Sequence, residues 1–303
     1  MKRNVVVVIC LVLAWLTPGV ALAAVRVFAC EPEWGALARE VGAGRVSVFD
    51  ATTALQDVHR IQARPSLIAQ ARTADLVVCS GADLEIGWLP LVLQQAGNPR
   101  ILPGRPGNLE AANYVRLLEV PTTVDRSMGD VHPRGNPHIQ WNPRNIETVA
   151  AELERRLTQI DPEGAQAYAA AGQDFRKRWT EAVPRWEQSA APLKGVPVVE
   201  HHKALTYLFA WLQMPVVGSL EPKPGVEPTS RYLRELVAQQ QLTPARMVVI
   251  TTVNNPDAAD WFAGQVKIPV VQMPYSVGGT PGAKDLFGMY EDGIARLLAG
   301  ARR

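Results

Sequence analysis

Short apolar segments that alternate with helical segments place the strongest limit on how this chain can fold. Residues 25–30, 45–49 and 75–79 are apolar and rich in β-forming side chains, and helical spacing follows each of them. Strands that are apolar on both faces are typical of parallel sheets covered by helices on each side. The alternation therefore predicts an α/β fold rather than an all-helical or all-β fold.

The same alternation returns in the second half of the chain. Strands are predicted at residues 196–199, 215–219, 247–251 and 269–273, with helices between them. We predict two doubly wound parallel-sheet lobes joined by one long connecting helix. The predicted ranges are 24–160 for the N-terminal lobe, 161–190 for the connecting helix and 191–303 for the C-terminal lobe.

The connecting segment begins at Asp161-Pro162, where proline takes the first helical position and its missing N–H does no harm. Aromatic side chains continue along one side to about Glu187. A helix of that length extends roughly 40 Å, which suits a connector that contacts both lobes. Pro184 is predicted to kink or fray the last turns, because it removes a helical hydrogen bond.

The first 23 residues have the pattern of a secretory signal rather than of a folded element. Lys2 and Arg3 precede an apolar core at residues 5–16, and residues 21–23 form a small-x-small cleavage site. The core is too short for a permanent membrane helix. We therefore expect an exported protein whose mature chain begins at Ala24.

The expected removal of the signal changes the charge balance and the cysteine content of the chain. Removing the signal lowers Lys plus Arg from 31 to 29, which equals the 29 Asp plus Glu. A chain with this balance offers no electrostatic argument for nucleic acid or an anionic membrane as a partner. Cys10 leaves with the signal, so only Cys30 and Cys79 remain, at the ends of two predicted strands. In an oxidising compartment they form either one disulfide or two small buried thiols, and the sequence leaves both open.

Histidine is the residue type that points to a binding site. The five histidines are His59, His132, His138, His201 and His202. Two of them share the loop at residues 129–143, where glycine and proline exclude regular structure. The others follow predicted strands, and ligands of open α/β sheets bind beyond the carboxyl ends of strands. Three neutral imidazoles from three segments suit zinc, so we predict one metal site between the lobes; three unrelated surface histidines are the alternative.

Several short motifs resemble those of a known family. In chain order they are Asp57-Val58-His59 with Pro65-Ser66, Thr73-Ala74-Asp75-Leu76-Val77-Val78 with Gly81 and Leu84-Glu85, Asn136-Pro137-His138 with Asn142-Pro143, His202-Lys203-Ala204-Leu205-Thr206-Tyr207, and Glu227-Pro228-Thr229-Ser230. Together they resemble the cluster A-I solute-binding proteins, the metal receptors of ABC importers for zinc and manganese, over nearly all of the mature chain. The resemblance implies a monomeric periplasmic receptor that delivers Zn²⁺ to an inner-membrane permease with its ATPase subunit.

The resemblance also implies the metal ligands. His59, His138 and His202 occupy the ligand positions of the motifs, and His202 rather than His201 directly precedes the Lys-Ala-Leu-Thr-Tyr pattern. Manganese receptors of the family commonly carry Glu at the third position, so His202 favours zinc. Asp57 is a candidate acceptor for the second nitrogen of a ligating ring.

The fourth ligand is where the chain departs from the family. The aspartate that often follows the last strand is missing, because residues 272–275 read Gln-Met-Pro-Tyr. Asp285 is our candidate in its place; the alternatives are that Asp285 caps the last helix, and that Glu200 or a water completes the site. His132 is interpreted as a lid residue, a transient second site or a solvated loop residue.

Two other functions compete with the zinc receptor. A receptor of the same type could carry manganese or iron. An exported zinc hydrolase is the second alternative, since three histidines and a water also form catalytic zinc sites, with Glu200 as the best candidate base. The chain lacks an H-E-x-x-H motif, so we expect a receptor and no enzyme.

Overall fold

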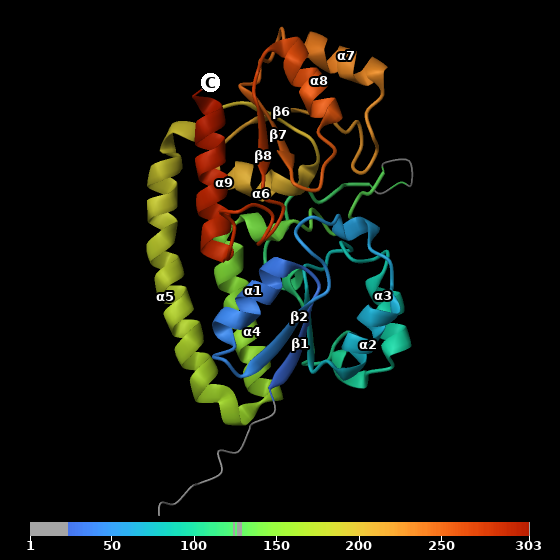
Figure 1. Cartoon of the computed structure of the whole chain (residues 1–303), viewed down its shortest axis with the longest axis vertical. Helices are drawn as coiled ribbons and strands as arrows, with labels where there is room; N and C mark the ends of the chain where they lie inside the picture. Colours follow the sequence, from blue (N-terminus) through green and yellow to red (C-terminus); the bar gives the residue numbers. More distant parts are fainter. Residues whose placement is uncertain (1–23, 124, 126–128, 303) are drawn as a thin grey trace, which may run out of the picture.

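The computed structural model describes residues 24–123, 125 and 129–302. The predicted signal peptide lies outside these residues. Figure 1 shows two α/β halves, one built on strands β1 to β4 and one on β5 to β8, with helix α5 running along the side of both. No helix in the described part of the chain has an apolar stretch long enough to cross a bilayer.

The N-terminal sheet is fully parallel, with strand order β2-β1-β3-β4. Its elements are β1 (Val25–Ala29), α1 (Pro32–Val41), β2 (Val46–Asp50), α2 (Pro65–Thr73), β3 (Leu76–Cys79), α3 (Leu89–Ala96) and β4 (Asn108–Glu110). Strand β4 was not predicted, because it has three residues and only Leu109 is buried. The helix predicted from residue 84 begins at Leu89 instead, after a turn in which Ala82 and Asp83 have positive φ angles.

The C-terminal sheet repeats that order as β6-β5-β7-β8, again fully parallel. Its elements are β5 (Val198–Glu200), α6 (Thr206–Leu212), β6 (Val216–Ser219), α7 (Ser230–Gln239), β7 (Met247–Thr251), α8 (Asp257–Val266), β8 (Val270–Met273) and α9 (Leu286–Ala301). Strands β3 and β7 are buried at every residue, as expected for parallel strands covered on both faces. The predicted pair of doubly wound parallel sheets is confirmed.

Two consecutive helices connect the sheets. Helix α4 (Pro143–Ile160) begins at Asn142, whose side chain accepts a hydrogen bond from the backbone of Arg144 at 3.0 Å. A 3₁₀ turn over Pro162–Gly164 precedes α5 (Ala165–Ala190), so the long helix starts later than predicted. It also continues beyond Pro184 to Ala190, and its last turns are not frayed.

Aromatic packing explains why the end of α5 stays helical. Trp179 and Trp186, on either side of Pro184, both pack on Tyr290 of α9, with ring centroids 5.4 and 5.0 Å apart. One continuous apolar core follows α5 through both halves, and it includes β1, β3, β5 and β7 residues. The Tyr290 hydroxyl also donates to the carbonyl of Gln140 at 2.6 Å. This core therefore fixes the end of the histidine-bearing loop.

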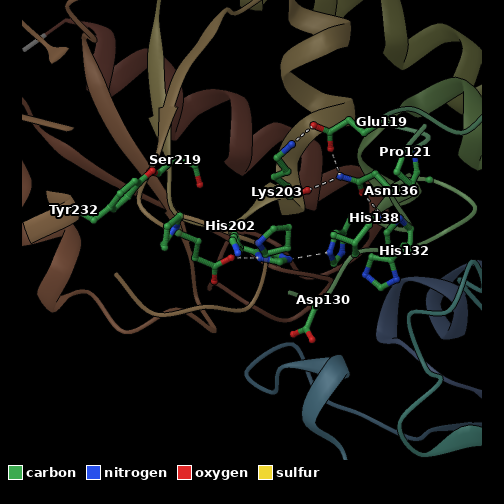
Figure 2. A pocket seen from close by; sticks show the side chains of 17 residues that line it. Glu119, Pro121, Asp130, His132, Asn136, His138, His202, Lys203, Ser219 and Tyr232 are labelled. Atoms are coloured by element: carbon green, nitrogen blue, oxygen red, sulfur yellow. Dashed lines mark hydrogen bonds and ion pairs between the residues drawn. The ribbon is translucent and has the colours of Figure 1, made fainter. Parts of the chain in front are cut away.

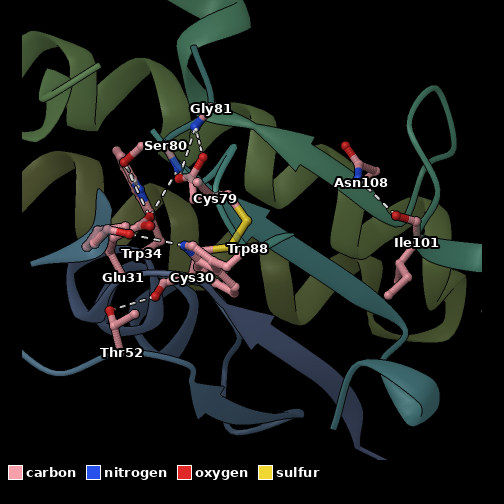
Figure 3. The surroundings of a disulfide bond; sticks show 12 residues. Cys30, Glu31, Trp34, Thr52, Cys79, Ser80, Gly81, Trp88, Ile101 and Asn108 are labelled. Atoms are coloured by element: carbon pink, nitrogen blue, oxygen red, sulfur yellow. Dashed lines mark hydrogen bonds between the residues drawn. A yellow bond between two sulfur atoms is a disulfide. The ribbon is translucent and has the colours of Figure 1, made fainter. Parts of the chain in front are cut away.

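Cys30 and Cys79 form a disulfide, which decides between the two states left open by the sequence. Cys30 directly follows β1, Cys79 is the last residue of the neighbouring parallel strand β3, and both are buried. Figure 3 shows the bridge next to Trp88, with Trp34 and Glu31 nearby. Trp34 donates to the hydroxyl of Ser80 at 2.9 Å. The disulfide thus links the carboxyl ends of the two central strands of the N-terminal sheet.

Candidate metal centre

The three histidines predicted as ligands meet in space. His59 lies in a 3₁₀ turn after β2, His138 directly precedes a 3₁₀ turn before α4, and His202 follows β5. One ring nitrogen of each lies within 4.8 Å of the others. His138 is fully buried, while the other two are partly buried. The fold therefore gathers imidazoles from three segments that are far apart in the sequence.

A fourth histidine, His132, lies beside this cluster and contacts His59, although it is outside the group of three whose nitrogens all lie within 4.8 Å of one another. The Nε2 atoms of His202 and His138 are 3.3 Å apart, and those of His59 and His132 are 3.2 Å apart. Nitrogens bound to a tetrahedral zinc at 2.0–2.1 Å are roughly 3.3 Å from each other. Each of these two nitrogen pairs thus has the spacing of neighbouring donors in a tetrahedral site.

His132 reaches the cluster because its loop turns back on itself. Gly135 has a φ of +119°, a conformation that an L side chain rarely adopts, and its N–H donates to the His132 carbonyl at 3.0 Å. His132 and His138 therefore approach His202 from the same loop, as Figure 2 shows. In the sequence, the only local sign of this turn is a glycine between two histidines. From that glycine we predicted only that the segment is not helical.

The loop is fixed from the other half of the molecule. Asn136 donates to the Lys203 carbonyl at 2.8 Å and to Glu119 at 2.9 Å, and its side-chain oxygen accepts from the His138 backbone at 2.9 Å. Tyr207 of α6 donates to the Asn136 carbonyl at 2.8 Å. The Asn-Pro-His motif therefore positions His138 through contacts with the segment that carries His202.

Two carboxylates orient ligand rings. Asp57 lies 2.8 Å from Nδ1 of His59, and Glu221 lies 2.8 Å from Nδ1 of His202. When Nδ1–H donates to a carboxylate, Nε2 carries the lone pair that a metal needs. The predicted Asp57 contact is confirmed. Glu221 was missed, because a residue 19 positions after His202 has no local signal that relates it to the ring.

Burial keeps two of the rings neutral. It lowers the pKa of His138 well below its usual value, and the neighbouring His202 and His59 add to this effect. Burial, again with His59 and His202, lowers the pKa of His132 to about 4. Burial is the largest single effect and would raise the pKa of Asp57, but its hydrogen bonds with His59, together with the charges of His59 and His202, lower it. The rings border a cavity of about 480 Å³ that is lined by His132, His138 and His202.

These shifts predict how the metal-free protein responds to acid. The unfolded state protonates His132 near pH 6.5 and the folded state near pH 4, so the unfolded state gains protons first as the pH falls. The stability that the neutral His132 ring contributes is therefore fully present above pH 6.5. It is lost between pH 6.5 and 4, and this loss amounts to roughly 3 kcal/mol for His132 alone. Urea unfolding of the metal-free protein at several pH values measures this. The His132→Gln variant should lose less stability over the same range, and an identical loss would contradict the assignment.

The other predicted site residues lie elsewhere. Asp285 is not among the clustered residues: it is exposed and caps α9, accepting from the Gly288 backbone at 2.8 Å. The geometry therefore gives its predicted ligand role no support and matches the capping alternative. Glu200 lines a different cavity, and burial, with the nearby Glu119, raises its pKa to about 8. A carboxyl that keeps its proton at pH 7 is poorly suited to act as a general base.

Nearly the whole chain is similar to proteins of a known family. A model of the family described as zinc-uptake complex component A, periplasmic (ZnuA), matches residues 27–300. Among curated proteins, none matches this sequence. A crystal structure of ZnuA superposes with a TM-score of 0.74 at 18% identity, over 91% of this chain and 98% of that one.

Two further solved structures carry different metals. A zinc-bound deletion mutant of ZnuA has a TM-score of 0.74 at 18% identity, covering 92% of this chain and 99% of its own. A manganese-bound periplasmic metal-binding protein from Candidatus Liberibacter asiaticus has a TM-score of 0.72 at 15% identity, covering 90% and 98%. At these identities the superpositions establish the fold, while the family model extends over nearly all of the described residues. The chain therefore belongs to the ZnuA family of periplasmic metal-binding receptors, which serve ABC importers and are not enzymes.

Proposed function

We propose that this protein captures one Zn²⁺ at His59, His138 and His202, with His132 as the fourth donor, and delivers it to an inner-membrane ABC permease with its ATPase subunit. The signal-like first 23 residues support a periplasmic location, where the protein acts as a monomer. The observation that carries the proposal is the pair of Nε2–Nε2 distances, 3.2 and 3.3 Å, because they match the edges of a tetrahedral zinc site.

The donor atoms favour zinc over manganese. Imidazole nitrogens approach one another in two pairs, His59 with His132 and His138 with His202, while the carboxylates of Asp57 and Glu221 contact the outer Nδ1 atoms of His59 and His202. Imidazole suits zinc, copper, iron and nickel, whereas manganese prefers carboxylate, carbonyl and water oxygens. A cargo of manganese would leave the four nitrogens poorly matched to the ion.

Competition between metals tests the proposal directly. The purified mature protein should bind one Zn²⁺ per chain and prefer it over Mn²⁺ by about a hundredfold or more, because nitrogen donors bind zinc more strongly. Isothermal titration with zinc, repeated in the presence of excess manganese, gives the stoichiometry and both affinities. Equal affinities, or tighter manganese binding, would overturn the zinc assignment and leave a manganese receptor.

Delivery is tested separately. The zinc-loaded protein should stimulate ATP hydrolysis by the reconstituted permease and ATPase, and the metal-free protein should stimulate it less, since receptors of this family serve ABC importers. The His138→Ala variant, exposed to the same zinc concentration, is the matched control. Stimulation that is independent of zinc would contradict a role in metal delivery.

A further inference from the structure

One loop of the C-terminal sheet inserts a side chain into the N-terminal half. Tyr275 follows β8, yet its buried ring lies in the apolar cluster formed by N-terminal residues that include Phe28, Val58 and Trp88. The same ring is edge-on to His138, with centroids 6.0 Å apart. Tyr275 therefore packs against a predicted ligand while it is surrounded by the opposite half of the molecule.

Three hydrogen bonds tie this loop to the N-terminal half. The hydroxyl of Ser276 donates to the carboxyl of Glu33, in the first turn of α1, and both side chains are buried. Thr252, after β7, donates to the Ala54 carbonyl at 3.1 Å and accepts from the Tyr275 backbone at 3.2 Å. Glu33 lies in the N-terminal half and Ser276 in the C-terminal half, so this contact joins the two halves of the molecule.

The surroundings of Glu33 are acidic. The titratable groups that face it are Glu31 from its own segment, Asp50 from β2, Glu85 from the turn after β3, Tyr275 from the loop after β8, and Tyr290 from α9. One of these groups, Asp50, is paired with Arg39 at 2.6 Å. Burial raises the pKa of Glu33 to about 7, although the Ser276 hydrogen bond opposes the shift. The carboxyl therefore keeps its proton in mildly acidic solution.

We propose that Glu33 is a positioning residue, which through Ser276 keeps Tyr275 against His138 and slows release of the metal bound there. The proposal requires that the loop that carries Ser276 moves away from Glu33 when the metal leaves, which breaks the contact and exposes the carboxyl to water. The proposal rests on the metal site described above, and it adds a residue that touches neither the ion nor a ligand.

The sign of the pH effect follows from linkage. Glu33 has a pKa of about 7 in the closed form, and near 4.5 once water reaches it. Raising the pH through this range therefore favours the open form, and metal release becomes faster. Protonation of ligand histidines has the opposite sign, because acid then speeds release. The two contributions are separated by comparing variants at each pH.

The decisive variant is Glu33→Gln, which retains a hydrogen-bond acceptor for Ser276 but cannot ionise. Release of Zn²⁺ into excess chelator is followed by stopped flow between about pH 5 and 8, with Mn²⁺ as the probe if the protein binds only that ion. The ratio of wild-type to variant release rates should rise by roughly tenfold or more over this range, since each pKa unit gives a factor of ten. The histidine contribution cancels in this ratio.

Two further variants complete the test. Ser276→Ala removes the contact and should release metal faster than wild type at every pH. Glu235→Gln, an exposed glutamate on α7 that pairs with Arg231, is the matched control and should leave the ratio flat. A flat ratio for Glu33→Gln, or wild-type release from Ser276→Ala, in a metal-binding protein would overturn this inference alone. A folded protein that binds neither ion would overturn it together with the proposed function.

Discussion

Replacing His138 with alanine should remove tight zinc binding. The ring is fully buried, lies 3.3 Å from His202 and has a lowered pKa, so it is neutral and ready to bind metal at pH 7. Loss of an outer partner of a metal ligand typically costs 10–100-fold in affinity, so loss of the ligand itself should cost at least about a hundredfold. Titration with zinc and metal analysis of the purified variant measure the change.

His201→Ala is the matched control for that experiment. His201 is buried next to His202, but it does not belong to the clustered group, and its Nδ1 has no hydrogen-bond partner among the described residues. This variant should bind one zinc with nearly wild-type affinity. If His201→Ala lost zinc while a folded His138→Ala retained it, the ligand assignment would be wrong, and His201 would replace His202 or His138 in the site.

Removing the disulfide should produce the largest loss of stability. Cys30 and Cys79 are 49 positions apart, and the chain-entropy estimate for a loop of this length is about 4 kcal/mol. We expect the Cys30→Ser, Cys79→Ser double variant to unfold at a markedly lower urea concentration, with a melting temperature lower by roughly 10 °C. Urea and thermal unfolding of the metal-free forms measure the difference.

Measuring zinc binding distinguishes a loss of stability from damage to the metal site. The histidine cluster contains no cysteine, so the folded double variant should keep its zinc stoichiometry. The wild-type protein treated with a reductant is the second comparison and should match the variant. An unchanged unfolding midpoint in both would mean that the bridge contributes little, and that packing of the buried strand ends suffices.

Sequence patterns predicted the sheets better than the boundaries of single elements. Strands such as β3 and β7 are apolar throughout, and this follows from burial on both faces. Strand β4 has a single buried residue, so its membership of the sheet depends on pairing with β3. At Pro184 the local rule predicted a disturbed helix, but packing of Trp179 and Trp186 on Tyr290 outweighs the lost hydrogen bond.

The metal centre was also predicted only in part from the sequence. Motifs close to each histidine pointed to His59, His138 and His202, and residue chemistry indicated zinc. Asp285 followed from an expected carboxylate near the last strand, whereas the structure uses it to cap α9. Its sequence position was compatible with both roles, and only the direction of the chain after β8 distinguishes them.

By itself, the sequence determined the fold class, the three principal histidines and the orientation of His59 by Asp57, because each depends on residues that are close together in the chain. The tertiary structure alone decided that His132 contacts His59, that Glu221 orients His202, and that Glu33 contacts Ser276. These contacts join segments up to 243 residues apart. Such contacts leave no periodic or local signal, because each depends on segments that are brought together only when the chain folds.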